Sequence, residues 1–528
     1  MNVWFIVTTG IYLYIFVRRF LYSVYIYQLV HYQIGSLLDW YYINKTNKKL
    51  LIPLVISILS LILVLLISFK YLLYFEMLLG IISLPFIKYQ PEKNKFNFTK
   101  RMKRLFACVF ILMLLLYFIT FGLLNYHYQL SEISFIYLLI INFLVFDLVI
   151  IAHFLAYPLE KLIQNKFINQ AMSKILENNR LSVIGITGSF GKTSTKFIIG
   201  NILKRAANVC VTPESYNTPM GITLSVNRYL KNIDDYFVCE MGARRVGEIK
   251  ELTEIVFPKI GVLTSIGPQH LETFGNIKNI IKTKFELIES LPNDGLAILN
   301  YDNLYIRDYQ LKSGIKVLTY GIENKNVDYH GFNIYYGKDG SRFEIKFPNQ
   351  EKYLFTTKLL GKHNISNILA GVALADYLAM NVNKIINTVS LLKPIEHRLE
   401  LKAFENYSII DDSFNANYEG ACNALDILNH FHNIRIIITP GLIELGIDQD
   451  NYNYYLGEKI AKICDFVVLV GVKQTYKLYE ALEDVNYPQE KILVTNSYNE
   501  GFKYILDTFK ENFTLLIEND LPDNYSEI

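Results

Sequence analysis

Residues 181–203 read LSVIGITGSFGKTSTKFIIGNIL, and this stretch decides the fold of the second part of the chain. It has the order of an apolar strand, a glycine-bearing turn and a helix, which is the context that a phosphate-binding loop requires. Gly188 and Gly191 let the backbone turn tightly, so that its N–H groups face phosphate oxygens at a helix N-terminus. We therefore predict a nucleotide site, with Lys192 at the β and γ phosphates and Thr193 at Mg²⁺.

The loop matches the general Walker pattern only in its second half, because Ile186 stands where that pattern has a glycine. The alternative is an ordinary strand-to-helix turn with an incidental lysine. The position of GKTS directly at the junction between strand and helix favours the phosphate-binding loop.

The segment TGSFGKTS (187–194) is similar to the TGxxGKTS loop of the Mur ligases, the enzymes that build the peptide stem of the bacterial cell wall. Further segments follow in the order of that family over about residues 180–450, and they most resemble its D-alanyl-D-alanine-adding branch. The resemblance implies a P-loop ATPase-like central domain, placed at 181–392, and a Rossmann-like C-terminal ligase domain at 393–528. Strands and helices alternate after residue 407, which favours α/β structure with a parallel sheet.

The resemblance also implies that ATP is held from two sides. The loop, SYNTPMGI (215–222) and GKHNISN (361–367) supply one side, and PIEHRLEL (394–401) and DDSFNAN (411–417) supply the other. The polar residues of the last segment could equally form an Asx-rich turn and nothing more. The residues implied for ATP are Gly188, Ser189, Phe190, Gly191, Lys192, Thr193, Ser194, Asn217, Asn364, Asn367, Arg398 and Asp412, and those for the lip that closes over substrate are Ser413, Asn415 and Asn417.

Magnesium ligands are implied by two further segments of the central domain. Mg²⁺ prefers oxygen ligands and is usually held by one or two carboxylates, phosphate oxygens and waters, which suits Glu240 and Thr193. The resemblance adds a second magnesium ion beside His270, and Lys284 as a carbamate, because an unmodified lysine would repel the metal.

Each implied ligand has a structural alternative. Glu240 could be a solvated carboxylate at a strand end, and His270 a hydrogen-bonded structural histidine. Lys284 could belong with Lys278 and Lys282 to one solvated helix face.

The implied reaction activates a substrate carboxylate with the γ-phosphoryl group of ATP, and an incoming amine then attacks the acyl phosphate to form an amide. Two Mg²⁺ ions, Lys192 and Arg398 would neutralise the transferring phosphoryl group, with His270 and Lys284 completing the catalytic set. Closure of the C-terminal domain would exclude water.

The first part of the chain is strongly apolar. Because a bilayer core requires about 20 apolar residues as helix, 51–69 and 105–124 are expected to span a membrane. With the weaker stretches 3–17, 71–87 and 134–157, we predict about five spans in residues 1–158, followed by an amphipathic linker at 159–180. Within them, Asn142, Asp147 and His153 do not share a helix face, so we expect interhelical contacts rather than a proton or substrate path.

The distribution of basic residues predicts the orientation. Loop 88–104 and segment 18–50 carry many lysines and arginines, whereas 125–133 has none. Short basic loops stay cytoplasmic. We therefore predict a multi-pass protein of the cell membrane with its N-terminus outside and the catalytic region in the cytoplasm.

Membrane helices stand where the soluble cell-wall ligases have the domain that holds the UDP of their substrate. This difference predicts a lipid-linked or membrane-proximal carboxylate acceptor, with an amino acid or peptide as the amine. A poly-γ-glutamate-type polymer ligase would use the same ATP and metal residues. A nucleotide-regulated transporter or scaffold is a different class, disfavoured because few polar residues line the spans.

Composition excludes little more. A formal charge of +3 on 528 residues does not indicate a nucleic-acid partner. The five cysteines are scattered without zinc spacing, as expected for reduced thiols in a cytosolic enzyme region.

Overall fold

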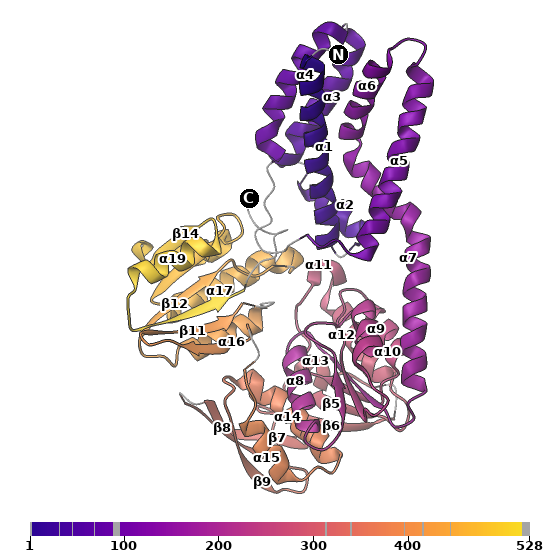
Figure 1. The fold of residues 1–528 in the computed structure, drawn as a ribbon. Helices are drawn as coiled ribbons and strands as arrows, with labels where there is room; N and C mark the ends of the chain where they lie inside the picture. Colours follow the sequence, from indigo (N-terminus) through magenta and orange to yellow (C-terminus); the bar gives the residue numbers. More distant parts are fainter. Residues whose placement is uncertain are drawn as a thin grey trace. The chain divides into compact units, whose positions relative to one another are not determined.

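A computed structural model describes residues 3–30, 32–44, 46–67, 69–87, 96–311, 314–337, 340–394, 397–413, 417–443 and 445–519. The chain divides into two compact units, one up to Gln164 and one from Asn165 onward. Figure 1 shows helices in the first unit and two sheets with their helices in the second. The predicted fold class, a helical region followed by α/β structure, is therefore confirmed, whereas the predicted domain limits stay predictions.

The first unit is built from apolar helices. Two of them, α1 and α5, are long and apolar enough to cross a membrane, and the pair α6 and α7 would be a third span if counted together. The runs predicted at 51–69 and 71–87 form shorter apolar helices, so a count of five spans stays a prediction. The helices are α1 (Val3–Leu29), α2 (Ile34–Asn44), α3 (Lys48–Leu66), α4 (Phe69–Ser83), a 3₁₀ turn (Leu84–Ile87), α5 (Lys100–Leu124), α6 (Leu130–Phe143) and α7 (Val145–Leu176).

The structure adds detail to two sequence predictions for this region. The stretch 134–157 is not one helix, because α6 ends at Phe143 and α7 begins at Val145 after a bend of 75°. Most of the predicted linker 159–180 continues α7 without a break, because Ala171 and Ile175 at its end pack into the core of the second unit. Residues 88–95 of the basic loop lie outside the described residues, so the orientation stays a prediction.

Polar groups inside the first unit are more numerous than the sequence indicated. Asn142 donates to the carbonyl of Tyr12 at 3.1 Å and His153 bonds to a tyrosine hydroxyl of α1, both as predicted interhelical contacts. Asp147, in contrast, is exposed in the first turn of α7, where a carboxylate stabilises a helix N-terminus. The buried Glu76 accepts hydrogen bonds from Tyr12 and Ser60.

The central sheet of the second unit positions the nucleotide loop. Its nine strands run in the order β2-β3-β1-β4-β5-β6-β7-β8-β9, parallel up to β7 and antiparallel beyond it. The strands are β1 (Ser182–Thr187), β2 (Val209–Val211), β3 (Tyr236–Glu240), β4 (Ile260–Leu263), β5 (Leu296–Asn300), β6 (Lys316–Gly321), β7 (Tyr329–Gly337), β8 (Gly340–Lys346) and β9 (Lys352–Thr357). The antiparallel strands β8 and β9 were not predicted.

Helices cover both faces of the parallel part of this sheet, which explains why β1, β4 and β5 are buried along nearly their whole length. Ile184 and Ile186 of β1 pack in one core with α8 and α14, and Val183 packs in another with α10 and α12. The carboxyl ends of β1, β3, β4 and β5 therefore share one edge, where loops can gather functional side chains. The helices are α8 (Lys192–Leu203), α9 (Pro219–Tyr229), α10 (Glu248–Val256), α11 (Leu271–Phe274), α12 (Ile277–Glu289), α13 (Leu304–Arg307), α14 (Lys362–Tyr377) and α15 (Val382–Ser390).

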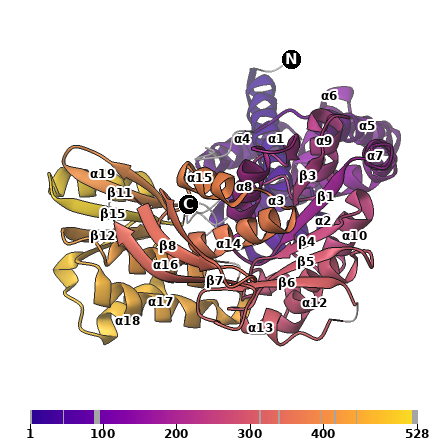
Figure 2. The same cartoon turned by 90° about the horizontal axis from the view of Figure 1, so that it is seen from below.

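The second sheet, in the C-terminal part, has the order β10-β11-β15-β12-β13-β14. Figure 2 labels its strands β11, β15 and β12. The sheet is parallel as predicted, except that β10 pairs antiparallel at the edge. Its elements are β10 (Glu400–Ala403), β11 (Tyr407–Asp412), α16 (Tyr418–Leu428), β12 (Ile434–Thr439), a 3₁₀ turn (Gly446–Asp448), α17 (Gln449–Ile463), β13 (Phe466–Val470), α18 (Tyr476–Asp484), a 3₁₀ turn (Gln489–Lys491), β14 (Ile492–Thr495), α19 (Tyr498–Thr508) and β15 (Phe513–Glu518).

Candidate nucleotide and metal site

The predicted loop connects β1 to α8 and depends on two glycines. Gly188 and Gly191 both have positive φ, and Gly191 is the N-cap of α8. A Cβ on Gly191 would lie 2.6 Å from Oδ1 of Asn367, and one on Gly188 would lie 2.1 Å from Oγ1 of Thr264. Since L side chains rarely adopt this conformation and have no room here, only glycine fits both positions.

The loop is tied to the segment that follows β4. Its N–H groups at Ser189 and Phe190 donate to the carbonyl and hydroxyl of Ser265, at 2.8 and 2.9 Å. The Ser189 hydroxyl bonds to the backbone of Gly267 at 3.0 Å. The turn is thus held in one shape by the neighbouring strand end.

Lys192 lies within the turn rather than in solvent. Its ammonium donates to the carbonyls of Gly188 and Ser189, at 2.7 and 3.0 Å. Burial, opposed by the charge of Glu240 and assisted by that of Arg398, lowers the pKa of Lys192 to about 8. A phosphate group would replace these neutral carbonyls with charged oxygens, which is the role that the sequence predicted for Lys192.

Glu240 is buried at the carboxyl end of β3 and only 1% exposed, so the solvated alternative is wrong. Asn217 donates from Nδ2 to Oε1 of Glu240 at 3.0 Å. Nζ of Lys196 lies 3.1 Å from Oε2, an ion pair that lacks the angle of a hydrogen bond. Burial alone would raise the pKa of Glu240, but Lys196 and Lys192 together lower it. The sequence analysis missed Lys196.

Lys284 is 2% exposed on α12, whereas Lys278 and Lys282 are exposed, so Lys284 does not belong to a solvated face. Its Nζ lies 6.0 Å from the ring centre of Phe274. Burial, with the positive charge of Lys192, holds the pKa of Lys284 well below its usual range. His270, with φ of 53°, directly precedes α11 on the loop after β4.

The chemistry of these donors fits a magnesium ion that also binds phosphate. Within the described ranges, no group of three or more histidines, cysteines, aspartates and glutamates could hold a metal ion. Glu240 is nevertheless a buried carboxylate held in place, and Thr193 lies in the first turn of α8. A site with one carboxylate and one hydroxyl fits an ion that takes its other ligands from phosphate and water.

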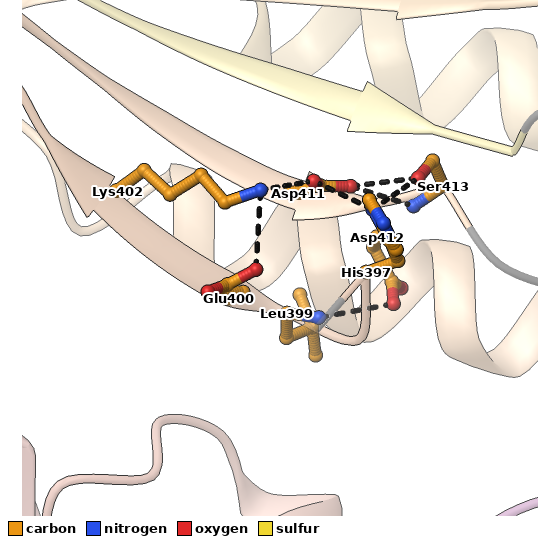
Figure 3. A network of polar contacts seen from close by, with 7 residues as sticks. All are labelled: His397, Leu399, Glu400, Lys402, Asp411, Asp412 and Ser413. Carbon is orange, nitrogen blue, oxygen red and sulfur yellow. Dashed lines mark hydrogen bonds and ion pairs between the residues drawn. The ribbon is translucent and has the colours of Figure 1, made fainter. Parts of the chain in front are cut away.

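The C-terminal part contributes Arg398 and Asp412. Nη2 of Arg398 donates to Oγ1 of Thr193 at 3.2 Å. Oδ1 of Asp412 accepts from the backbone N–H of Leu399 at 3.1 Å (Figure 3). Burial raises the pKa of Asp412 to about 7, although Arg398 opposes the shift.

The neighbouring Asp411 organises a separate polar network (Figure 3). Lys402 and the Ser413 hydroxyl each donate to it at 2.7 Å, and His397 lies 2.9 Å away. Asn417 caps α16 by accepting from Gly420 at 2.8 Å. Ser413 and Asn417 therefore have structural contacts, as the Asx-turn alternative expected, and their role in a lip stays a prediction. Asn415 lies outside the described residues.

A cavity of about 390 Å³ lies beside the loop, lined from both parts by Phe190, Asn300, His363, Asn367, Arg398 and Asp412. Oδ1 of Asn367 accepts from Thr195 at 3.1 Å, while its buried Nδ2 has no partner among the described residues. Asn364 instead donates to the carbonyl of Leu360, a structural contact. Burial lowers the pKa of His363 to about 4, so this histidine, which the sequence analysis passed over, is neutral.

A second, larger cavity has a volume of about 1050 Å³. Its lining includes Thr193, Lys204, Arg205 and Lys393, and Arg398 lines both cavities. The basic lining suits a ligand with carboxylate groups.

Comparison with known proteins agrees with this geometry. The model of the Mur ligase middle domain matches residues 186–375. The UDP-N-acetylmuramoyl-tripeptide–D-alanyl-D-alanine ligase of Escherichia coli K12 is 31% identical over 303 residues, which are 57% of this chain and 66% of that enzyme. The Bacillus subtilis 168 ligase of the same name is 30% identical over 369 residues, 67% of this chain and 78% of that enzyme. The chain thus spans slightly less than two thirds of the E. coli enzyme.

Two solved structures have the same fold. MurF from Acinetobacter baumannii has a TM-score of 0.62 at 23% identity. The match covers 69% of this chain and 78% of the Acinetobacter chain. MurF ligase from Thermotoga maritima in complex with ADP has a TM-score of 0.62 at 24% identity. The match covers 69% of this chain and 82% of the Thermotoga chain.

The two sheets and the glycine loop between β1 and α8 define an α/β protein of the kind that binds nucleotides, in which the C-terminal part contacts the first turn of α8. With the Bacillus subtilis ligase similar over most of its length, this chain belongs to the Mur ligase family.

Proposed function

We propose that the chain is an ATP-dependent ligase that joins a carboxylate to an amine in the synthesis of peptidoglycan precursors or a related envelope polymer. ATP would supply the phosphoryl group that activates the carboxylate as an acyl phosphate. The observation that carries the proposal is the position of Arg398, which bonds to Thr193 of the loop and lines both cavities. Arg398 can thereby contact both the terminal phosphate of the nucleotide in one cavity and a second substrate in the other.

The residues of the site have different roles in the proposed reaction. Lys192 and Arg398 neutralise charge on the transferring phosphoryl group. The helix N-terminus at Gly191 and the loop N–H groups orient the phosphates. Glu240 and Thr193 would hold Mg²⁺ together with phosphate oxygens, and the ion would neutralise phosphate charge. Asn367, whose buried Nδ2 has no hydrogen-bond partner among the described residues and whose Oδ1 faces Gly191, is suited to donate to the nucleotide.

We also propose that Lys284 is carbamylated. A buried lysine with a strongly lowered pKa keeps a nucleophilic amine that can react with carbon dioxide. The carbamate would exchange a poorly solvated ammonium for an anion able to face a second magnesium ion beside His270. Mass spectrometry of the intact protein, with and without bicarbonate, tests this step through a mass increase that Lys284→Ala abolishes.

The acceptor that we propose is a lipid-linked or membrane-proximal carboxylate, and the protein would be a multi-pass membrane protein with a cytoplasmic site. The support is the run of apolar helices before the α/β unit. Equal rates on a soluble UDP-muramoyl peptide and its lipid-linked form would contradict the lipid-linked acceptor.

The proposed activity is tested by phosphate release from ATP with membrane-extracted precursors and a panel of amino acids and dipeptides. We expect release that requires both acceptor and amine, and an amide in the product. Product analysis separates a precursor ligase from a polymer ligase. Normal function of Lys192→Ala and Lys284→Ala would instead support a nucleotide-regulated transporter or scaffold.

A further inference from the structure

Lys196 lies one helical turn after Lys192 and is completely buried. Its ammonium donates to the backbone carbonyl of Glu214 and lies 3.1 Å from Oε2 of Glu240. A lysine is almost never fully buried unless it is paired, because its charge loses the solvation of water. The ion pair with Glu240 therefore compensates the buried charge of Lys196 at the edge of the sheet.

The two oxygens of Glu240 have different partners. Oε2 faces the charged ammonium of Lys196, and Oε1 accepts from the neutral amide of Asn217. A cation that approaches this carboxylate can displace a neutral amide at much lower cost than a buried ammonium, whose loss would leave two charges unpaired. Oε1 is therefore the oxygen available to a metal ion.

The pair also sets the charge of the site. With Lys196 beside it, Glu240 has little net attraction for a bare divalent ion. Phosphate oxygens would add the negative charge that is missing.

We propose that Lys196 is a positioning residue that fixes Glu240 for one-oxygen coordination of Mg²⁺ and suppresses metal binding before nucleotide arrives. The ion then binds as a complex with nucleotide. This inference rests on the proposed function only for the identity of the ion.

The test adds MgCl₂ alone to the full-length protein in detergent and measures how far its thermal unfolding temperature shifts. Wild type should shift by about 1 °C or less, whereas Lys196→Met should shift by several degrees, corresponding to at least a roughly tenfold lower Kd for Mg²⁺. Lys282→Met, which removes an exposed lysine from α12, is the matched control and should behave as wild type. The double variant Lys196→Met/Glu240→Gln should lose the shift.

Equal Mg²⁺ responses in wild type and Lys196→Met would overturn the inference, as would a response that survives in the double variant. If Lys196→Met unfolds without metal, its recovery with MgCl₂ alone supports the inference. Failure of that recovery, while the double variant folds, contradicts it. Because the titration uses no substrate, phosphate release measured in parallel reports separately on the ligase activity.

Discussion

Nη2 of Arg398 lies 3.2 Å from Oγ1 of Thr193, so a residue of the C-terminal part reaches the first turn of the helix that follows the phosphate-binding loop. Burial lowers the pKa of Arg398 but leaves a guanidinium charged at neutral pH. Arg398→Ala should reduce kcat by about 10²- to 10³-fold, as expected for loss of a group that stabilises a transferring phosphoryl group. Steady-state phosphate release, with Arg435→Ala as a control outside both cavities, measures the effect. Unchanged kcat would remove Arg398 from the mechanism.

Gly191→Ala should abolish tight nucleotide binding and destabilise the fold by about 1–3 kcal/mol. The new Cβ adds strain at positive φ and meets Oδ1 of Asn367. Gly275→Ala is the matched control, since Gly275 has the same φ of +77° but no atom within 4 Å of the added Cβ. Calorimetric titration with ATP should separate the two variants; equal ATP affinities would show that contact with Asn367 is unimportant.

Glu518 predicts a dependence of stability on pH. It is completely buried, and neither carboxylate oxygen has a hydrogen-bond partner among the described residues. Burial, with Asp412 on the neighbouring strand, raises the pKa of Glu518 well above 4.5. The folded state therefore retains a proton that the unfolded chain releases, and stability from this group falls as pH rises above about 4.5.

Glu518→Gln, which cannot ionise, should unfold at a higher temperature than wild type at pH 8, and this difference should shrink toward pH 5. Thermal unfolding across that range measures it, with the exposed Glu490→Gln as control. A difference that stays constant with pH would contradict an ionisable group at this position.

Lys284 and Lys282 lie on the same helix but differ in burial, which gives a direct contrast. Lys284→Ala should lose nearly all phosphate release, whereas Lys282→Ala should retain it. Depleting carbon dioxide should reduce the activity of wild type and that of Lys282→Ala to the same extent. Full activity of Lys284→Ala would exclude a role for its carbamate.

The sequence predicted the elements whose pattern is local. Gly188 and Gly191 directly follow an apolar strand in the sequence, and the structure has the predicted strand, turn and helix at that place. Burial could not be predicted in the same way. Lys196 looks like any polar position of a helix until β2 and β3 bring Glu214 and Glu240 to it.

Packing and local contacts also explain the other differences between the sequence predictions and the structure. Lys284 shares its spacing with solvated lysines, and only the packing of α12 against the central sheet buries it. The bend between α6 and α7 falls inside a continuous apolar run, so composition did not mark it. Ser413 and Asn417 matched a functional motif, yet their hydrogen bonds to Asp411 and Gly420 are those of an ordinary turn and helix cap.

The central claim is that the carboxylate is activated as an acyl phosphate at Lys192 and Arg398. Acceptor labelled with ¹⁸O in its carboxylate, incubated with ATP and the amine, tests it most directly. The account predicts one ¹⁸O atom in each inorganic phosphate released by wild type and no labelled phosphate from Lys192→Met. Unlabelled phosphate accompanying amide formation, or label recovered in AMP, would contradict it.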